Sequence, residues 1–334
     1  MSAIRLGTRA STLATTQSEM VARLLRSEGL DVDLTTIITH GDTSTASLAA
    51  MGGIGVFASA IRATLLKGEA DIAVHSFKDL PTGRPLGLAI GAVPARADPR
   101  DALVARDGLT LHDLPQEASV GTGSPRRAAQ LLAVRPDLTI VDIRGNVDTR
   151  LGRVKGLGHY AKGGGKEDLD AVVLAASGLA RLGHSGTVTE FLDPSVVLPA
   201  PAQGALAVEC RTADSRHGKL AKALARIDDR RTRLAATAER AVLSHLEAGC
   251  AAPIGALAQL KPVSGSSPQV LTLDVVVATV DGSRIIREQV SVELPAEVDS
   301  ALAAAHTLGV TAAEELLDDG AADVADLKAS GSTR

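Results

Sequence analysis

The chain has 334 residues, of which 45% are hydrophobic and 22% are charged, a composition typical of a soluble protein with two or three domains. Its net charge of −4, with three Phe, one Tyr and no Trp, argues against a basic face or aromatic stacking platforms, so we expect no nucleic-acid partner. Without a ~20-residue apolar run, a signal-peptide pattern or a disulfide framework, the chain is expected to be a cytoplasmic monomer with no membrane partner.

The first 95 residues alternate strand-like and helix-like segments, which predicts a mostly parallel sheet with helices on both faces. The expected elements are strands at 4–8, 32–39 and 71–76 and helices at 11–26 and 54–67. A second α/β unit follows a connector at 93–101 that is rich in proline and charge. Its expected elements are strands at 102–105, 119–121, 139–143 and 170–175 and helices that begin near Ser124 and Asn146.

The apolar stretch 205–210 predicts a strand that returns to the first sheet, which would make the first domain discontinuous. From residue 214 the pattern is that of an α+β unit, with helices expected at 219–227, 231–247 and 299–317 and strands at 254–260, 272–279 and 284–294. We therefore predict domain 1 at 1–95 and 198–213, domain 2 at 96–197, domain 3 at 214–320 and a flexible tail at 321–334.

Ionisable side chains follow the predicted strand 71–76 at once. The apolar run ends in His75 and Ser76, and Lys78 and Asp79 come directly after. Because ligands of open α/β sheets gather beyond the carboxyl ends of the strands, Asp79 is a candidate catalytic carboxylate with Lys78 as a charge partner. The alternative is a solvated turn that Pro81 closes.

The segment 119–127 reads as a strand, a turn of Gly, Ser and Thr, and a helix start. Ser124 can cap the helix, and the Pro that follows suits the first helical position. Backbone amides, hydroxyls and the helix dipole would then converge on one anion site, which Arg126 and Arg127 would reinforce. An exposed basic first turn is the weaker alternative, because cations there oppose the helix dipole.

Two further turns have the same design. Arg144 and Arg150 flank the helix start at Asn146, and Arg9 precedes a helix that Ser11 would cap. Gln17 lies two helical turns further on and could face the same cleft. Three such turns imply a ligand with many negative groups, although any one arginine could belong to a structural ion pair.

Cys250 lies in a predicted loop between a long helix and a strand, flanked by Gly249 and Pro253. Free cysteines are more often small buried hydrophobes, but this loop favours a nucleophile or an attachment point. Because no Cys-x-x-Cys or His-x-x-x-His pair is present, we expect no metal site. The remaining alternatives are a non-catalytic protein that binds an anionic ligand and an enzyme that handles phosphate at the Gly-Thr-Gly-Ser turn.

These motifs, in this order, resemble the porphobilinogen deaminase (hydroxymethylbilane synthase) family over residues 4 to about 320. The most specific are His-Ser-x-Lys-Asp at 75–79, Arg-Gly-Asn-x-x-Thr-Arg at 144–150 and Gly-Cys-x-x-Pro-Ile-Gly at 249–255. The resemblance implies two α/β domains of the type II periplasmic-binding-protein kind with a cleft, plus a smaller α+β C-terminal domain.

The resemblance also implies an activity, that of a transferase in tetrapyrrole (haem and porphyrin) biosynthesis. Four porphobilinogen molecules would be joined head to tail on a covalently bound dipyrromethane, with ammonia lost at each addition, and hydrolysis would release hydroxymethylbilane. Cys250 would hold the dipyrromethane cofactor through a thioether. The product would pass to uroporphyrinogen-III synthase.

By the same resemblance Asp79 is the catalytic aspartate, which would stabilise the cation left by ammonia loss and assist proton transfer. The residues implied to bind substrate and cofactor are Arg9, Ser11, Gln17, Ser76, Lys78, Thr122, Ser124, Arg126, Arg127, Arg144, Gly145, Arg150, Gln203 and Gly204. The chain departs from the family pattern at Ala50, Ile54 and Ser59, where many members carry lysines in and after a glycine-rich lid. Asp148 stands where the family has a small or neutral residue, and at the first turn of a helix it would suit the dipole.

Overall fold

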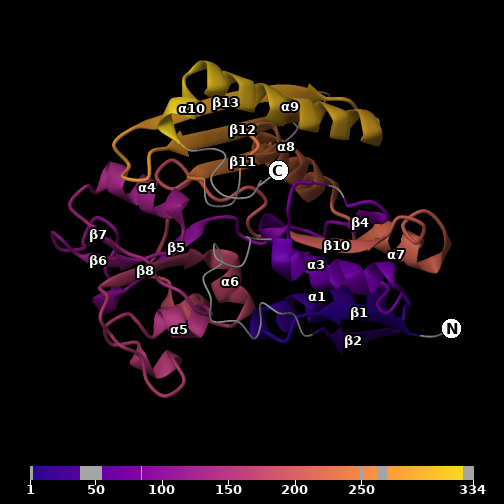
Figure 1. Cartoon of the computed structure of the whole chain (residues 1–334), viewed down its shortest axis with the longest axis horizontal. Helices are drawn as coiled ribbons and strands as arrows, with labels where there is room; N and C mark the ends of the chain where they lie inside the picture. The colour runs from indigo at the N-terminus through magenta and orange to yellow at the C-terminus, as the bar shows by residue number, and fades with distance from the viewer. Residues whose placement is uncertain (1–2, 38–54, 84, 249–251, 262–268, 326–334) are drawn as a thin grey trace. The chain divides into compact units, whose positions relative to one another are not determined.

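The computed structural model describes residues 3–37, 55–83, 85–248, 252–261 and 269–325 (Figure 1). The chain forms two compact units, one made of Met1–Ala97 and Ala205–Thr237 and the other of Asp98–Gly204 and Ala238–Ala329. The finer division into three domains with the boundaries given above stays a prediction.

The first unit contains a mixed sheet in the order β2-β1-β3-β10-β4. Its strands are β1 (Ile4–Thr8), β2 (Val32–Thr36), β3 (Ile72–Ser76), β4 (Leu88–Ala92) and β10 (Leu206–Arg211). β1 runs parallel to β2 and β3, whereas β10 is antiparallel to both β3 and β4. The predicted return of 205–210 to the first sheet is therefore confirmed.

Helices α1 (Thr12–Ser27), α3 (Gly55–Leu66) and α7 (Gly218–Ile227) complete the first unit. On α1 the residues Val21, Ala22 and Leu25 recur at helical spacing, and all three are fully buried. They pack in one core with Leu6 of β1 and Val208 of β10. The amphipathic pattern read from the sequence thus fixes α1 against the sheet.

The second unit contains a mixed sheet in the order β7-β6-β8-β5-β9. Its strands are β5 (Asp101–Ala105), β6 (Ser119–Gly121), β7 (Thr139–Val141), β8 (Ala171–Ala175) and β9 (Glu190–Phe191). Its helices are α4 (Pro125–Val134), α5 (Val147–Leu151) and α6 (Ala176–Arg181). Every residue of β5 is buried, as expected for a strand covered on both faces.

A separate antiparallel sheet in the order β11-β12-β13 belongs to the C-terminal part of the chain. It is formed by β11 (Ile254–Leu260), β12 (Gln269–Ala278) and β13 (Ile285–Leu294), with α8 (Arg230–His245), α9 (Val298–Asp318) and α10 (Ala321–Val324) beside it in sequence. Two mixed α/β sheets and this small α+β part confirm the expected α/β class with a smaller α+β C-terminal part. None of the helices described is long and apolar enough to cross a membrane.

The predicted flexible tail is wrong at its start. Residues 321–324 form α10, in which Ala321 is fully buried and Val324 is 6% exposed. Gly320 supplies the left-handed turn, with φ of 85°, that lets the chain fold back after α9. The sequence did not predict this helix because the segment is acidic and its few apolar residues are too short a run to show a helical period. The tail from residue 326 lies outside the described residues.

A buried carboxylate joins three elements of the first unit. Glu209 of β10 is 1% exposed, and Nε of Arg62 on α3 lies 3.0 Å and 3.1 Å from its two carboxylate oxygens. Nε2 of His75 on β3 lies 3.3 Å from Oε2 of the same carboxylate. Burial alone would raise the pKa of Glu209, but His75 and Arg62 hold it below its usual value.

We predict that Glu209→Ala lowers the free energy of unfolding by about 3 kcal/mol, because it leaves a largely buried guanidinium without its carboxylate. The depressed pKa means that the contribution of Glu209 is present above the unfolded pKa of about 4.3 and is lost as the pH falls below it. Urea unfolding at several pH values measures both effects. Glu19→Ala, which removes an exposed pair with Arg23 and Arg26, is the control and should cost at most about 1 kcal/mol. Equal unfolding midpoints for the two variants would contradict the prediction.

Candidate functional site

In the first unit, Asp79 stands on a tight turn directly after β3. The 3-10 helix Phe77–Asp79 follows Ser76, and the Leu80 amide donates to the Phe77 carbonyl. Phe77 and Leu80 are buried, whereas Asp79 is exposed. The two apolar side chains therefore anchor the turn and leave the Asp79 carboxylate at the surface beyond the strand, where the sequence placed it.

Two of the predicted binding residues meet in this unit. The side-chain amide of Gln17, buried on α1, donates to Ser76 Oγ at 2.8 Å, and the Ser76 hydroxyl donates back to Gln17 Oε1 at 3.2 Å. Ser11 caps α1 as predicted, since its Oγ accepts from the Ala14 amide at 3.3 Å. Gln17 and Ser76 thus hold the start of α1 and the end of β3 together.

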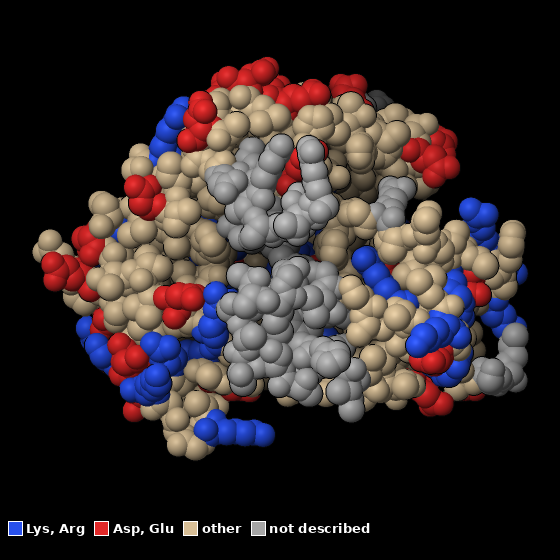
Figure 2. Space-filling model, in the orientation of Figure 1, with Lys and Arg blue, Asp and Glu red and all other residues tan. Residues whose placement is uncertain are grey.

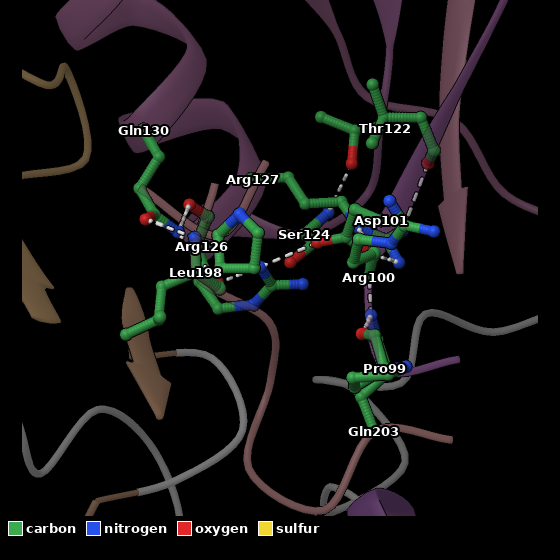
Figure 3. Close-up of polar contacts among 12 residues, drawn as sticks. Pro99, Arg100, Asp101, Thr122, Ser124, Arg126, Arg127, Gln130, Leu198 and Gln203 are labelled. Carbon is green, nitrogen blue, oxygen red and sulfur yellow. Dashed lines mark hydrogen bonds and ion pairs between the residues drawn. The ribbon is translucent and has the colours of Figure 1, made fainter. Parts of the chain in front are cut away.

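In the second unit, one buried carboxylate holds both arginines of the α4 turn (Figure 3). Asp101, the first residue of β5, is fully buried and accepts from Arg126 Nη1 at 2.8 Å. Its other oxygen accepts from Arg127 Nε at 2.9 Å and Nη2 at 2.7 Å. Burial would raise the pKa of Asp101, but the two guanidiniums hold it far below its usual range. The side chains of Arg126 and Arg127 are only 5% and 7% exposed, so each one forms the structural ion pair that the sequence left open.

Gln203 extends this cluster. It is fully buried, and its side-chain amide donates to Asp101 Oδ1 and to the Pro99 carbonyl, both at 2.8 Å. Gly204 follows with φ of 87°, and its carbonyl accepts from Arg181 Nη2 at 2.7 Å. The structure therefore brings Gln203 together with the arginines through Asp101, a residue that sequence reasoning missed. The feature of the sequence that could have indicated Asp101 is a charged residue at the start of an otherwise apolar strand.

The α4 turn differs from its prediction in one respect. Ser124 occupies the capping position, but its side chain makes no capping hydrogen bond. Instead the Ser124 amide donates to Oγ1 of Thr122, which is buried, at 3.2 Å. The expected capping bond of Ser124 is therefore wrong, because the hydroxyl of Thr122 already organises the turn.

The α5 turn carries an electropositive cluster. Asn146 caps the helix by accepting from the Thr149 amide at 2.8 Å, and Gly145 takes φ of 105°, which favours glycine. Arg150 is half-buried, with its Nε donating to the Gly145 carbonyl at 2.9 Å. Figure 2 shows Lys and Arg gathered over the region where Figure 1 places α5.

The pKa of Arg150 also reflects the neighbouring positive charges. Burial, together with the charges of Arg127 and Arg144, lowers the pKa of Arg150. Two acidic residues belong to this turn: Asp142, which is exposed and lies 3.3 Å from Arg144 Nη2, and Asp148, which contacts His184. The guanidiniums of Arg127, Arg144 and Arg150 repel one another, and an anionic ligand would relieve this repulsion.

Arg181, at the end of α6, is a candidate site residue that the sequence did not predict. Its Nε is buried without a hydrogen-bond partner among the described residues. Burial lowers the pKa of its guanidinium to about 10. A buried cationic donor left in this state is costly unless a ligand completes it. Nothing in the sequence distinguishes Arg181 from an ordinary arginine at a helix end.

Several residues singled out in the sequence belong to none of the clusters described above. Cys250, Ala50 and Ile54 lie outside the described residues, and Ser59 lies on α3. The second cysteine, Cys210, is buried on β10, where burial and then Asp214 raise the pKa of its thiol to about 11, a value typical of an inert thiol. Within the described ranges, no group of three or more His, Cys, Asp or Glu could hold a metal ion.

We predict that Asp101→Asn lowers the free energy of unfolding by about 3–5 kcal/mol, because two buried guanidiniums lose their only shared carboxylate. Since the folded-state pKa of Asp101 is depressed, its contribution is complete above the unfolded value of about 3.9 and is lost as the pH falls below it. The stability gap between wild type and variant, measured by urea unfolding, should therefore narrow in acid. Asp168→Asn, at an exposed pair with Arg153, is the control. A gap that is constant from pH 7 to pH 3 would refute the assignment.

Comparison with known proteins adds the family. The model described as "Porphobilinogen deaminase, dipyromethane cofactor binding domain" matches residues 4–219, and "Porphobilinogen deaminase, C-terminal domain" matches residues 233–318. A Porphobilinogen deaminase of Cutibacterium acnes is 96% identical over 334 residues and covers 100% of both chains. One of Micrococcus luteus is 51% identical, covering 96% of this chain and 94% of its own. A solved nutrient binding protein from Burkholderia cenocepacia bound to methionine has a TM-score of 0.39 at 16% identity, covering 66% of this chain and 91% of its own. The chain therefore belongs to the porphobilinogen deaminase family.

Proposed function

We propose that this chain joins four porphobilinogen molecules head to tail on a covalently bound dipyrromethane, with ammonia lost at each addition and hydroxymethylbilane released by hydrolysis. The observation that carries the proposal is the excess of guanidinium groups in the second unit. Each pyrrole of the substrate carries an acetate and a propionate, so a growing chain accumulates carboxylates. Arginine grips carboxylates with paired hydrogen bonds, which suits it to this ligand better than lysine.

The guanidinium groups of the second unit also fit a dipyrromethane, because it too carries several carboxylates. Arg126 and Arg127 share the single carboxylate of Asp101, and Nε of Arg181 is buried without a hydrogen-bond partner among the described residues, so positive charge exceeds negative charge in this cluster. A dipyrromethane, with two rings, carries four carboxylates. The half-buried Arg150 and the unsatisfied Nε of Arg181 are the strongest candidates for its contacts.

The attachment of the cofactor is proposed at Cys250 through a thioether. When bound, the dipyrromethane supplies the pyrrole carbon to which the first substrate is added. The support comes from the sequence, where Cys250 lies between Gly249 and Pro253 in the motif that the family shares. Cys210 is a poor alternative because it is buried with a raised thiol pKa.

Asp79 is proposed as the catalytic residue. Loss of ammonia from the aminomethyl group of porphobilinogen leaves a cation conjugated with the pyrrole ring, and the Asp79 carboxylate would stabilise that charge as it develops. The same carboxyl oxygen would give a proton to the leaving nitrogen and accept one from the newly coupled ring carbon. The turn at residues 77–79 supports this role because the Asp79 carboxylate is exposed there. It can contact a ligand without a rearrangement of the fold.

Arg9, Ser11, Gln17, Ser76 and Lys78 are proposed to hold substrate carboxylates near Asp79. The Gln17–Ser76 hydrogen bonds support this by fixing the polar end of β3. We further propose a cytoplasmic monomer that acts without a membrane partner. Because a linear tetrapyrrole must still be closed into a ring, its product is proposed to pass to uroporphyrinogen-III synthase.

We predict that Asp79→Asn lowers kcat by about 100-fold or more, the usual contribution of an acid–base group, and leaves the unfolding midpoint unchanged because the side chain is exposed. Steady-state assays of porphobilinogen consumption and urea unfolding measure the two effects. Glu69→Gln, at another exposed carboxylate of the same unit, should leave kcat unchanged. Normal turnover by Asp79→Asn would remove Asp79 from the mechanism.

We predict that wild-type protein has an intact mass above that of its sequence by one dipyrromethane, and that Cys250→Ser loses this excess because the thioether cannot form. Cys210→Ala is the matched control and should keep it. Intact-mass spectrometry of the purified proteins makes this test independent of activity. A Cys250→Ser protein that retained the excess would disprove the attachment site.

A further inference from the structure

Asp148 and His184 form an ion pair in the second unit that the proposed function does not use. Asp148 Oδ1, on α5, lies 2.7 Å from His184 Nε2, and the two side chains are 40% and 20% exposed. Both elements carry an arginine of the proposed site. Arg150 follows Asp148 by two residues on α5, and Arg181 ends α6 three residues before His184.

His184 is a fixed point of the fold. α6 ends in a Schellman motif, in which the His184 amide donates to the Leu179 carbonyl at 2.8 Å and the Gly183 amide donates to the Ala180 carbonyl at 3.1 Å. Gly183 takes the left-handed conformation that this motif requires, with φ of 78°. The ring of Tyr160 meets the His184 ring edge-on, with centroids 5.1 Å apart. Backbone and ring contacts together set the direction of the imidazole.

The α5 helix, in contrast, has little stability of its own. Its five residues, Val147–Leu151, form little more than one turn, which is too short to persist without tertiary contacts. The fully buried side chain of Leu151 anchors one end, and the Asn146 cap anchors the other. The Asp148–His184 contact is the link between the middle of this turn and the end of α6.

The pair also decides where a carboxylate goes. Residues two apart on a helix point to different faces, so Asp148 directed at His184 faces away from the Arg150 side chain. The contact with His184 therefore holds the face of α5 that is opposite to Arg150. On the side of His184 the pair is packed against Tyr160, whose ring in turn contacts that of His159 at 4.3 Å.

We propose that Asp148 and His184 are a pair of positioning residues that holds the α5 turn, and with it Arg150, in the place where substrate carboxylates bind. The inference rests on the proposed function, because it assumes that Arg144 and Arg150 bind the carboxylates of porphobilinogen or of the growing chain. Neither residue of the pair is assigned a contact with substrate.

The test compares steady-state kinetics of His184→Ala, His184→Gln and Asp148→Ala holoenzymes. His184→Ala should raise KM for porphobilinogen about fivefold, the scale of coupling between contacting residues, with kcat within about twofold, because the reacting groups near Asp79 are untouched. His184→Gln should recover the wild-type KM, since its amide can still donate to Asp148. Asp148→Ala should raise KM by a similar factor, because it removes the same contact between α5 and the end of α6.

Three measurements keep the outcomes separate. Intact mass must show the dipyrromethane excess in each variant, and thermal unfolding reports stability. Asp137→Ala, which removes a 2.7 Å pair with Arg135 of similar exposure in the same unit, is the control for lost stability and should keep the wild-type KM. If KM follows the melting temperature across all variants, the control included, the pair is only structural and the proposal is overturned.

Arg150→Gln distinguishes failure of this proposal from failure of the proposed function. If Arg150→Gln raises KM while the His184 and Asp148 variants keep the wild-type value, the positioning role falls and the arginine site stands. If Arg150→Gln leaves KM unchanged, the arginine site falls and the positioning role falls with it. A raised KM in both Arg150→Gln and His184→Ala, with recovery in His184→Gln, supports both.

Discussion

The second unit depends on a carboxylate that cannot neutralise all the charge around it. Asp101 is fully buried and accepts hydrogen bonds from two guanidiniums and from Gln203. Removing a carboxylate from water is costly, and only such dense bonding offsets that cost. One negative charge against two positive ones leaves an excess of positive charge in a region of low dielectric. A site that binds a polyanion needs this imbalance, because a neutral cluster would hold its ligand weakly.

The first unit uses a buried carboxylate differently. Glu209 has Arg62 and His75 as its partners, on a helix and on a neighbouring strand. A single guanidinium already balances its charge, so the cluster leaves no excess for a ligand. Its effect is mechanical, because it ties α3 and β3 to β10, and β3 leads into the turn of Asp79. The two units thus separate their tasks: one gathers positive charge, and the other presents a carboxylate on a rigid strand end.

The sequence predicted the features of this arrangement that depend on local chemistry. Strand ends, the turns beyond them, the cap of Ser11, the helix start at Asn146 and the return of β10 to the first sheet all follow from patterns of a few residues. It did not predict which arginines are buried, because Arg126 and Arg127 are paired with a residue about 25 positions away and with strands that the fold alone brings near. Arg181 shows the same limit, since the burial of its Nε comes from tertiary packing. Ser124 occupies the capping position without a side-chain capping bond, and the hydrogen bond of its turn is instead the one from its amide to Thr122.

The burial of Arg126 and Arg127 does not decide between a structural ion pair and a ligand site, because a guanidinium can serve both. Arg126 uses Nη1 for Asp101 and for the Leu198 carbonyl. Arg127 uses Nε and Nη2 for Asp101 and Nη1 for the Val173 carbonyl. Each guanidinium has five N–H donors in a rigid plane, so these contacts fix its plane while N–H groups remain for a ligand at the exposed edge. A lysine, with one nitrogen, could not be held and still present a directed pair of donors. In the proposed function, the structural pair orients the guanidinium that binds the ligand.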